Sequence, residues 1–154
     1  MRRRPAVKKK IIPDAKYNEI VVARFINYLM KGGKKSVVEK AVYDALQRVE
    51  KKLSLKAIDA FKKAVDNVTP RIEVRSKRIG GATYQIPVEV QPRRGSSLAL
   101  KWLKTAIRKT SGRSLSDKIF TNIVDSIDNK GWAAKKREEV FKMAESNKAF
   151  AHYA

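Results

Sequence analysis

Apolar residues recur at the spacing of an amphipathic helix over most of the chain, and alternate with polar residues in one central stretch. The helical pattern fills residues 14–70, where Gly32-Gly33 separates the first two stripes. It returns in residues 93–154, with a further interruption at Gly112. We therefore predict a mainly α fold, a single-domain bundle of about six helices in two groups of three.

Serine residues mark several of the expected helix starts. Ser36, with a glutamate three residues later, fits a capping box for the second helix. Ser54 stands before the third helix, Ser96 or Ser97 before the fourth, and Ser114 before the fifth. Each hydroxyl would accept a hydrogen bond from a free backbone N–H in the first turn of its helix.

The alternating stretch, residues 71–92, predicts a protruding two-stranded antiparallel β-hairpin. Its register depends on the loop. A two-residue loop would place Ile72 opposite Glu89, whereas a three-residue loop at residues 80–82 places Ile72 opposite Val90. Only the second register gathers the apolar residues on one face, so we predict the three-residue turn.

In the predicted register Arg71, Arg75 and Lys77 share one face with Pro87, and Arg78 lies near the tip. A two-stranded hairpin is marginally stable by itself, so a long basic one suggests an arm that reaches for an anion. The alternative is a solvated hairpin that packs its apolar face on the helices.

Charge is the strongest compositional feature. The 154 residues include 36 Lys and Arg against 15 Asp and Glu, a net charge of +21 and a pI of about 10.4. A charge this large repels itself and is most easily maintained when a polyanion neutralises it. Nucleic acid is the first candidate for that polyanion. A membrane surface is second, although no segment approaches the roughly 20 apolar residues of a spanning helix. We expect no membrane partner.

Residues 1–13 carry six basic residues, no acidic residue and two prolines, which predicts a basic extended arm. No apolar stretch follows the arginines, so the segment is not a secretory signal, while a transit peptide stays possible on its arginine content. The chain has no cysteine, which excludes disulfides and thiolate zinc sites and fits a reducing compartment.

Signals for catalysis are weak. The one histidine, His152, lies two residues from the end of the sequence. Residues 32–36 resemble a phosphate-binding loop but lack its first glycine and the preceding strand. They fit a turn between helices, whose amides and lysines could still hold a phosphate. We expect no catalytic residues, no metal site, no cofactor and no small-molecule substrate.

Basic residues gather in four groups that are candidates for binding RNA. They are Arg2, Arg3, Arg4, Lys8, Lys9 and Lys10 in the arm; Lys34 and Lys35; Arg75, Lys77, Arg78, Arg93 and Arg94 in and after the hairpin; and Arg113 and Lys118, preceded by the stripe Lys101, Lys104 and Arg108. Such a stripe alone is typical of a solvated helix face. The four groups together indicate a nucleic-acid-binding surface.

Aromatic residues are few, and the spacing of Trp102 places it in the core. Tyr84 is the best candidate to stack on an unpaired base, and its alternative is packing over Arg78. Binding should therefore rest on phosphates and shape, which fits structured RNA. Neutralising about eight phosphates would make affinity fall roughly 10⁴-fold between low and moderate salt.

Two long motifs resemble one family. RIEVRSKRIGGATYQIPVEVQPRR at residues 71–94 is similar to the signature of small-subunit ribosomal protein seven, and KKREEVFKMAESNKAFAHY at residues 135–153 resembles its bacterial-type ending. The resemblance implies a six-helix domain with a protruding hairpin. It also implies primary binding to the 3′ major domain of small-subunit rRNA, nucleation of head assembly, and a place at the subunit interface.

The resemblance carries further expectations about partners. The RNA contacts would come from the four basic groups, apart from the stripe. The hairpin tip, with Gly80, Gly81, Ala82 and Tyr84, would approach the exit-site tRNA near the mRNA exit channel. Ribosomal proteins nine and eleven of the small subunit would be neighbours, in a cytoplasmic ribosome.

Two rival functions follow from the same residues. A DNA-bending architectural protein would insert a basic ribbon into a minor groove, often with an apolar wedge that residues 80–82 lack. An RNA-modifying enzyme would need a cofactor loop or a catalytic cluster, and the sequence offers neither.

Overall fold

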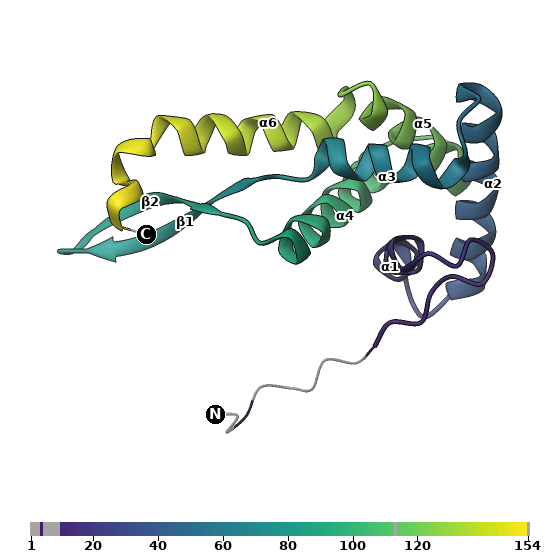
Figure 1. Cartoon of the computed structure of the whole chain (residues 1–154), viewed down its shortest axis with the longest axis horizontal. Helices are drawn as coiled ribbons and strands as arrows, with labels where there is room; N and C mark the ends of the chain where they lie inside the picture. The colour runs from purple at the N-terminus through teal and green to yellow at the C-terminus, as the bar shows by residue number, and fades with distance from the viewer. Residues whose placement is uncertain (1–3, 5–9, 113, 154) are drawn as a thin grey trace.

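A computed structural model describes residue 4, residues 10–112 and residues 114–153 of the chain (Figure 1). It contains six α-helices, one hairpin and a short 3₁₀ helix, η1, which confirms the predicted mainly α class. In chain order the elements are α1 Ile20–Leu29, α2 Lys35–Leu53, α3 Ala57–Val68, β1 Ile72–Ile79, β2 Ala82–Glu89, α4 Pro92–Lys109, α5 Leu115–Ile127, α6 Gly131–Ser146 and η1 Lys148–Tyr153.

The core lies mainly between helices α1 to α5, where their apolar stripes meet, and also includes Ala133 of α6. Phe25 of α1 and Phe61 of α3 pack with ring centroids 5.0 Å apart, and Leu46, Leu103 and Ile123 are fully buried around them. These residues recur at helical spacing, so burying each stripe against its neighbours removes apolar surface from water. The helical body thus forms a stiff base for the hairpin.

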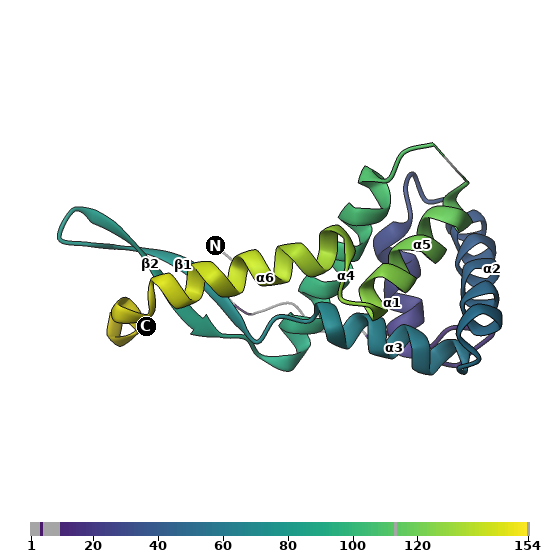
Figure 2. The same ribbon diagram turned by 90° about the horizontal axis from the view of Figure 1, so that it is seen from above.

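The hairpin projects from one end of this body, and α6 runs beside it (Figures 1 and 2). At the end of α6 the chain turns back, and η1 packs on β2. Phe150 of η1 lies against Tyr84 with ring centroids 5.2 Å apart, while Ile86 is only 2% exposed. Because a two-stranded ribbon is marginal alone, α6 and η1 supply the packing that it lacks.

The predicted register of the hairpin is wrong. Ile72 pairs with Glu89 and Ile79 with Ala82, so only Gly80 and Gly81 form the loop. Both glycines have positive φ, +56° and +89°, as a type I′ turn requires. That turn matches the right-handed twist of the strands.

The prediction failed because it assumed that one face of the ribbon is buried and the other solvated. The structure instead covers parts of both faces. Ile72 lines a groove with Phe141 of α6, and Ile86, on the opposite face, is buried. Apolar residues therefore need not gather on one side, and the geometry of the turn decides the register.

Ser114 is the expected serine cap that the structure confirms: its Oγ accepts a hydrogen bond from the backbone N–H of Asp117 at 3.2 Å. The capping box expected at Ser36 is wrong. The second helix already begins at Lys35, so Ser36 lies inside its first turn and the side chain of Lys34 forms no cap.

The caps expected at Ser54 and at Ser96 or Ser97 are also wrong. Ser54 ends α2 with φ of +53° and does not begin α3. Helix α4 starts earlier than predicted, at Pro92, because the fixed φ of proline suits the first helical position. Ser96 and Ser97 therefore lie inside α4, where each hydroxyl donates to the carbonyl four residues earlier at 3.0 Å.

Candidate nucleic-acid interface

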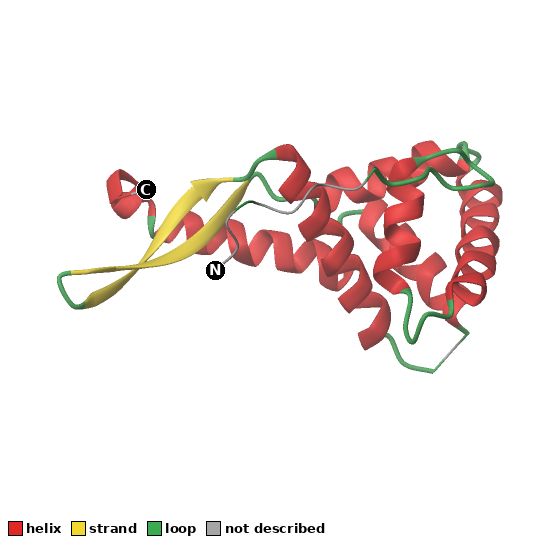
Figure 3. Cartoon of the chain, turned by 90° about the horizontal axis from the view of Figure 1, so that it is seen from below, coloured by secondary structure: helices red, strands yellow, loops and turns green. Residues whose placement is uncertain are grey.

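The hairpin extends beyond the helical body (Figure 3). Its basic side chains are exposed along its length. Arg75 and Lys77 share one face, and Arg78 lies on the other, with Nε 3.4 Å from the carbonyl oxygen of Gly81. Pro87 pairs with Val74, so the prediction that it shares a face with Arg75 and Lys77 is wrong. The ribbon thus presents positive charge from both faces.

A buried carboxylate joins the hairpin to α4. Glu73 of β1 accepts hydrogen bonds from Nε of Arg75 and from Nε of Arg94, each at 2.6 Å. Burial raises the pKa of Glu73, but the hydrogen bonds and charges of Arg94 and Arg75 outweigh burial, and its pKa lies below the ordinary value. Glu73 is therefore ionised at neutral pH, between two predicted RNA-binding arginines.

Arg93 and Arg94 lie in the first turn of α4, directly after the hairpin. The hairpin closes where the N–H of Val90 donates to the carbonyl of Arg71 at 2.9 Å. Arg93 is exposed beside Arg94. The structure thus brings the predicted residues of the hairpin and of α4 into one continuous basic region.

The other predicted residues of the helical body lie elsewhere. Lys34 and Lys35 stand where α1 passes into α2, and Lys35 contacts Glu39 at 3.5 Å. Lys118 is half-buried on α5, which packs against α2. Because α2 lies at the opposite end of the molecule from the hairpin tip (Figure 1), these three lysines, which we call the second basic region, lie apart from the hairpin.

The basic arm is described only in part. Arg4 and Lys10 are exposed, whereas Arg2, Arg3, Lys8 and Lys9 lie outside the described residues, as does Arg113. The point where the arm meets the helices is well fixed by Asp14.

The buried carboxylate of Asp14 accepts from the backbone N–H groups of Lys16 and Tyr17, both at 3.1 Å, and from the Tyr43 hydroxyl at 2.7 Å. Burial raises the pKa of Tyr43, and the hydrogen bond to Asp14 raises it further. The tyrosine therefore stays a neutral donor, and the arm leaves the body from a defined place on α2.

The stripe on α4 is only partly solvated. Lys101 and Arg108 are exposed, and Lys104 is half-buried. The next lysine, Lys109, lies 4.4 Å above the ring of Trp132 at the start of α6. Trp102 is half-buried and packs against the core, as its spacing predicted.

Tyr84 does not pack over Arg78. Its cross-strand partner is Lys77, and its ring is tilted by 54° against Phe150. The sequence could not indicate this contact, because Phe150 is far away along the chain. The packing leaves Tyr84 half-buried, a more restricted base-stacking candidate than the sequence suggested.

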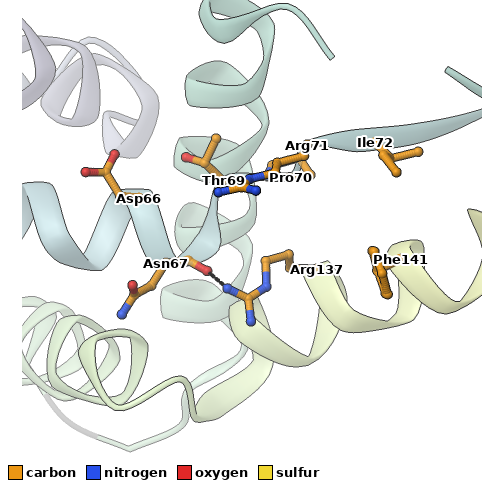
Figure 4. Close-up of a pocket in the computed structure, with 8 residues that line it drawn as sticks. All are labelled: Asp66, Asn67, Thr69, Pro70, Arg71, Ile72, Arg137 and Phe141. Carbon is orange, nitrogen blue, oxygen red and sulfur yellow. Dashed lines mark hydrogen bonds between the residues drawn. The ribbon is translucent and has the colours of Figure 1, made fainter. Parts of the chain in front are cut away.

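A shallow groove of about 490 Å³ between the end of α3, the start of β1 and α6 was not predicted (Figure 4). The Arg137 guanidinium in it donates to the backbone carbonyl of Asn67. The Asn67 side chain donates to carbonyls at the end of α5, at 2.9 and 3.1 Å. These hydrogen bonds connect both α6 and α5 to the end of α3, which indicates that the groove is a structural junction between helices.

Among the described residues, no group of three or more His, Asp or Glu side chains could hold a metal ion. Within the same residues no helix is long and apolar enough to cross a membrane. What the structure does offer is a stiff helical base, a braced cationic hairpin and a second basic region. These features define the class of basic proteins that bind nucleic acid through its phosphates.

Comparison with known proteins makes the class specific. Residues 1–148 match the family described as ribosomal protein S7p/S5e. Small ribosomal subunit protein uS7A/uS7B of Cereibacter sphaeroides (strain ATCC 17029 / ATH 2.4.9) is 49% identical over 152 residues, covering 99% of this chain and 97% of the relative. Small ribosomal subunit protein uS7 of Marinobacter nauticus is 49% identical, and that of Roseobacter denitrificans 48%, with the same coverage. The chain belongs to the ribosomal protein S7p/S5e family.

Membership of this family confirms a structural role in the small ribosomal subunit, in contact with rRNA, and a non-enzymatic function. It sets aside both rivals, the DNA-bending protein and the RNA-modifying enzyme. The individual RNA-contacting residues remain predictions.

Proposed function

We propose that this chain is a primary rRNA-binding protein that binds the 3′ major domain of small-subunit rRNA and nucleates assembly of the subunit head. The observation that supports the proposal most is the fixed pair of guanidiniums, Arg75 and Arg94, at the base of a projecting cationic hairpin. A protein that must bind early to a folding RNA benefits from cations whose positions are set before binding.

The two basic regions suggest how a single folded unit spans the RNA. The hairpin and the start of α4 would contact one part of the RNA, and Lys34, Lys35 and Lys118 would contact another. The arm, which leaves the body at α2, would add contacts of its own. Phosphate contacts of this kind position a protein on RNA without reading its bases. The whole chain then acts as one rRNA-binding domain.

The hairpin tip is proposed to lie at the subunit interface, near the exit-site tRNA and the mRNA exit channel. Gly80 and Gly81 carry no side chain, so the backbone there can approach a nucleic-acid strand closely. Ribosomal proteins nine and eleven of the small subunit are proposed as neighbours. We place the protein in a cytoplasmic ribosome, in keeping with its bacterial relatives.

A domain-selective binding experiment tests the main proposal. The purified chain is titrated with separately transcribed 3′ major, 5′ and central domains of small-subunit rRNA, and with duplex DNA, at moderate salt. We expect the 3′ major domain to bind at least tenfold more tightly than the other RNAs or the DNA. Equal affinity for all four would contradict the proposal.

Assembly is tested by reconstituting subunits with and without the chain. Omission should prevent later head proteins from joining while the other domains assemble normally. Unchanged head assembly would rule out a nucleating role while leaving rRNA binding intact.

A further inference from the structure

One acidic residue stands out inside the basic region at the base of the hairpin. Glu73 is only 7% exposed, in a chain with a net charge of +21. Burying a carboxylate is costly unless it is paired and hydrogen-bonded. Glu73 meets that condition with two arginines from different elements, Arg75 of β1 and Arg94 of α4.

The contacts use the two carboxylate oxygens separately. Oε1 accepts from Nε of Arg75 at 2.6 Å and lies 2.5 Å from its Nη2, whereas Oε2 accepts from Nε of Arg94 at 2.6 Å. One rigid carboxylate therefore sets the distance and the orientation between two guanidiniums. Without it, like charge would drive the two side chains apart.

The exposure of the three side chains is graded. The Glu73 side chain is 10% exposed, whereas Arg75 and Arg94 are 58% and 54% exposed. The carboxylate thus closes the inner side of the cluster, and the guanidiniums remain open to solvent. A guanidinium carries more N–H donors than the contact with Glu73 uses, and its planar fork suits phosphate oxygens.

We propose that Arg75, Glu73 and Arg94 form a clamp for one phosphodiester group of folded RNA, in which Glu73 is the positioning residue. The proposal rests on the proposed function, since it assumes that this region contacts rRNA. The clamp carries two positive guanidiniums and one negative carboxylate, so it still attracts phosphate. Its fixed geometry reduces the conformational entropy that is lost when both arginines bind.

The clamp makes a prediction opposite in sign to simple electrostatics. Glu73→Gln removes a negative charge, so general attraction to RNA should increase. If Glu73 positions the arginines, affinity for the 3′ major domain should instead fall, by roughly fivefold to tenfold for one lost charge-assisted contact. The matched control is Glu89→Gln, an exposed change on β2 that should leave affinity unchanged or slightly increased.

Arg94→Lys tests the clamp without removing charge or a buried group. Lysine cannot reproduce the fork that joins the carboxylate to a phosphate, so affinity should fall by a similar factor. Arg108→Lys, at an exposed position in the last turn of α4 outside the predicted RNA contacts, is its control and should bind as the wild-type protein does. This pair stays informative even if Glu73→Gln fails to fold.

A double-mutant cycle separates the clamp from the wider proposal. In an Arg75→Gln, Arg94→Gln background, Glu73→Gln should no longer lower the affinity, and should leave it unchanged or slightly increased as Glu89→Gln does. If Glu73→Gln in the otherwise wild-type chain strengthened binding as Glu89→Gln does, the positioning role of Glu73 would be overturned, whereas the proposal of rRNA binding would stand. If the double arginine variant bound like wild type, these arginines would not contact the RNA at all.

Discussion

Tyr84 of β2 and Phe150 of η1 pack with their ring centroids 5.2 Å apart and their planes tilted by 54°. This contact joins the far part of the hairpin to the end of the chain that follows α6. Because the other described residues of η1 are mainly exposed, we infer that the aromatic pair is the main packing contact by which η1 stabilises the hairpin.

Phe150→Ala should therefore loosen the hairpin. An aromatic pair contributes about 0.5–1.5 kcal/mol beyond simple burial, so the amides of β2 should exchange roughly threefold to tenfold faster with solvent. Val37→Ala is the control, since that side chain is 58% exposed on α2, at the opposite end of the molecule from the hairpin tip (Figure 1). Equal acceleration of β2 exchange in both variants would contradict the bracing role.

The turn makes a second prediction. Gly81 has φ of +89°, where a β-branched residue is strained, so Gly81→Val should destabilise the hairpin by roughly 1–3 kcal/mol. Gly80→Asn should be tolerated, because φ of +56° suits asparagine and nothing lies within 4 Å of an added Cβ. Cross-strand NMR contacts between Lys77 and Tyr84 should persist in Gly80→Asn. Their loss there would contradict the two-residue turn.

Two serines give a third prediction. Ser114→Ala removes the cap that accepts from the N–H of Asp117, and should lower the free energy of unfolding by about 1 kcal/mol. Ser96→Ala, inside α4, removes only a bond to the carbonyl of Pro92 and should change stability by less than about 0.5 kcal/mol. Denaturant unfolding of both variants measures the difference, and a larger loss for Ser96→Ala would contradict the cap assignment.

The sequence was informative wherever the needed information is local. Helical spacing identified the elements and the core, and a serine three residues before Asp117 identified one true cap. It failed at Ser36, Ser54, Ser96 and Ser97, because any serine near a helix start has the same local signature. Proline at position 92 decided the start of α4 instead.

The hairpin register and the Glu73 cluster depended on tertiary contacts. Alternation alone cannot tell that α6 and η1 cover part of the ribbon, so the assumption of a single buried face gave the wrong register. Likewise, Glu73 looks like an ordinary polar position in a strand. Only the fold brings Arg94 to it, although its place between Arg71 and Arg75 in the sequence was a usable signal.

Acid should weaken the junction between β1 and α4. The folded-state pKa of Glu73 lies below its ordinary value of 4.5, so the unfolded chain binds the proton more readily. Its stabilisation is thus present above pH 4.5 and is lost as the pH falls through the lower folded-state value. The stability gap between wild type and Glu73→Gln should be largest at neutral pH and shrink in acid. Unfolding of both proteins at neutral pH and in acid measures this difference in stability. A difference that stayed constant between the two conditions would contradict the prediction.

The most direct test of the account is the salt dependence of rRNA binding. Changing Arg75, Lys77 and Arg78 to Gln removes three exposed hairpin cations, and the control changes exposed Lys51, Lys56 and Lys63 of the α2–α3 region to Gln. Each lost phosphate contact flattens the slope of log affinity against log salt by about 0.7–0.9. We predict weaker binding and a slope flatter by roughly 2 for the hairpin variant, with a wild-type slope for the control. Identical slopes for the two variants would contradict the hairpin as the principal RNA-binding element.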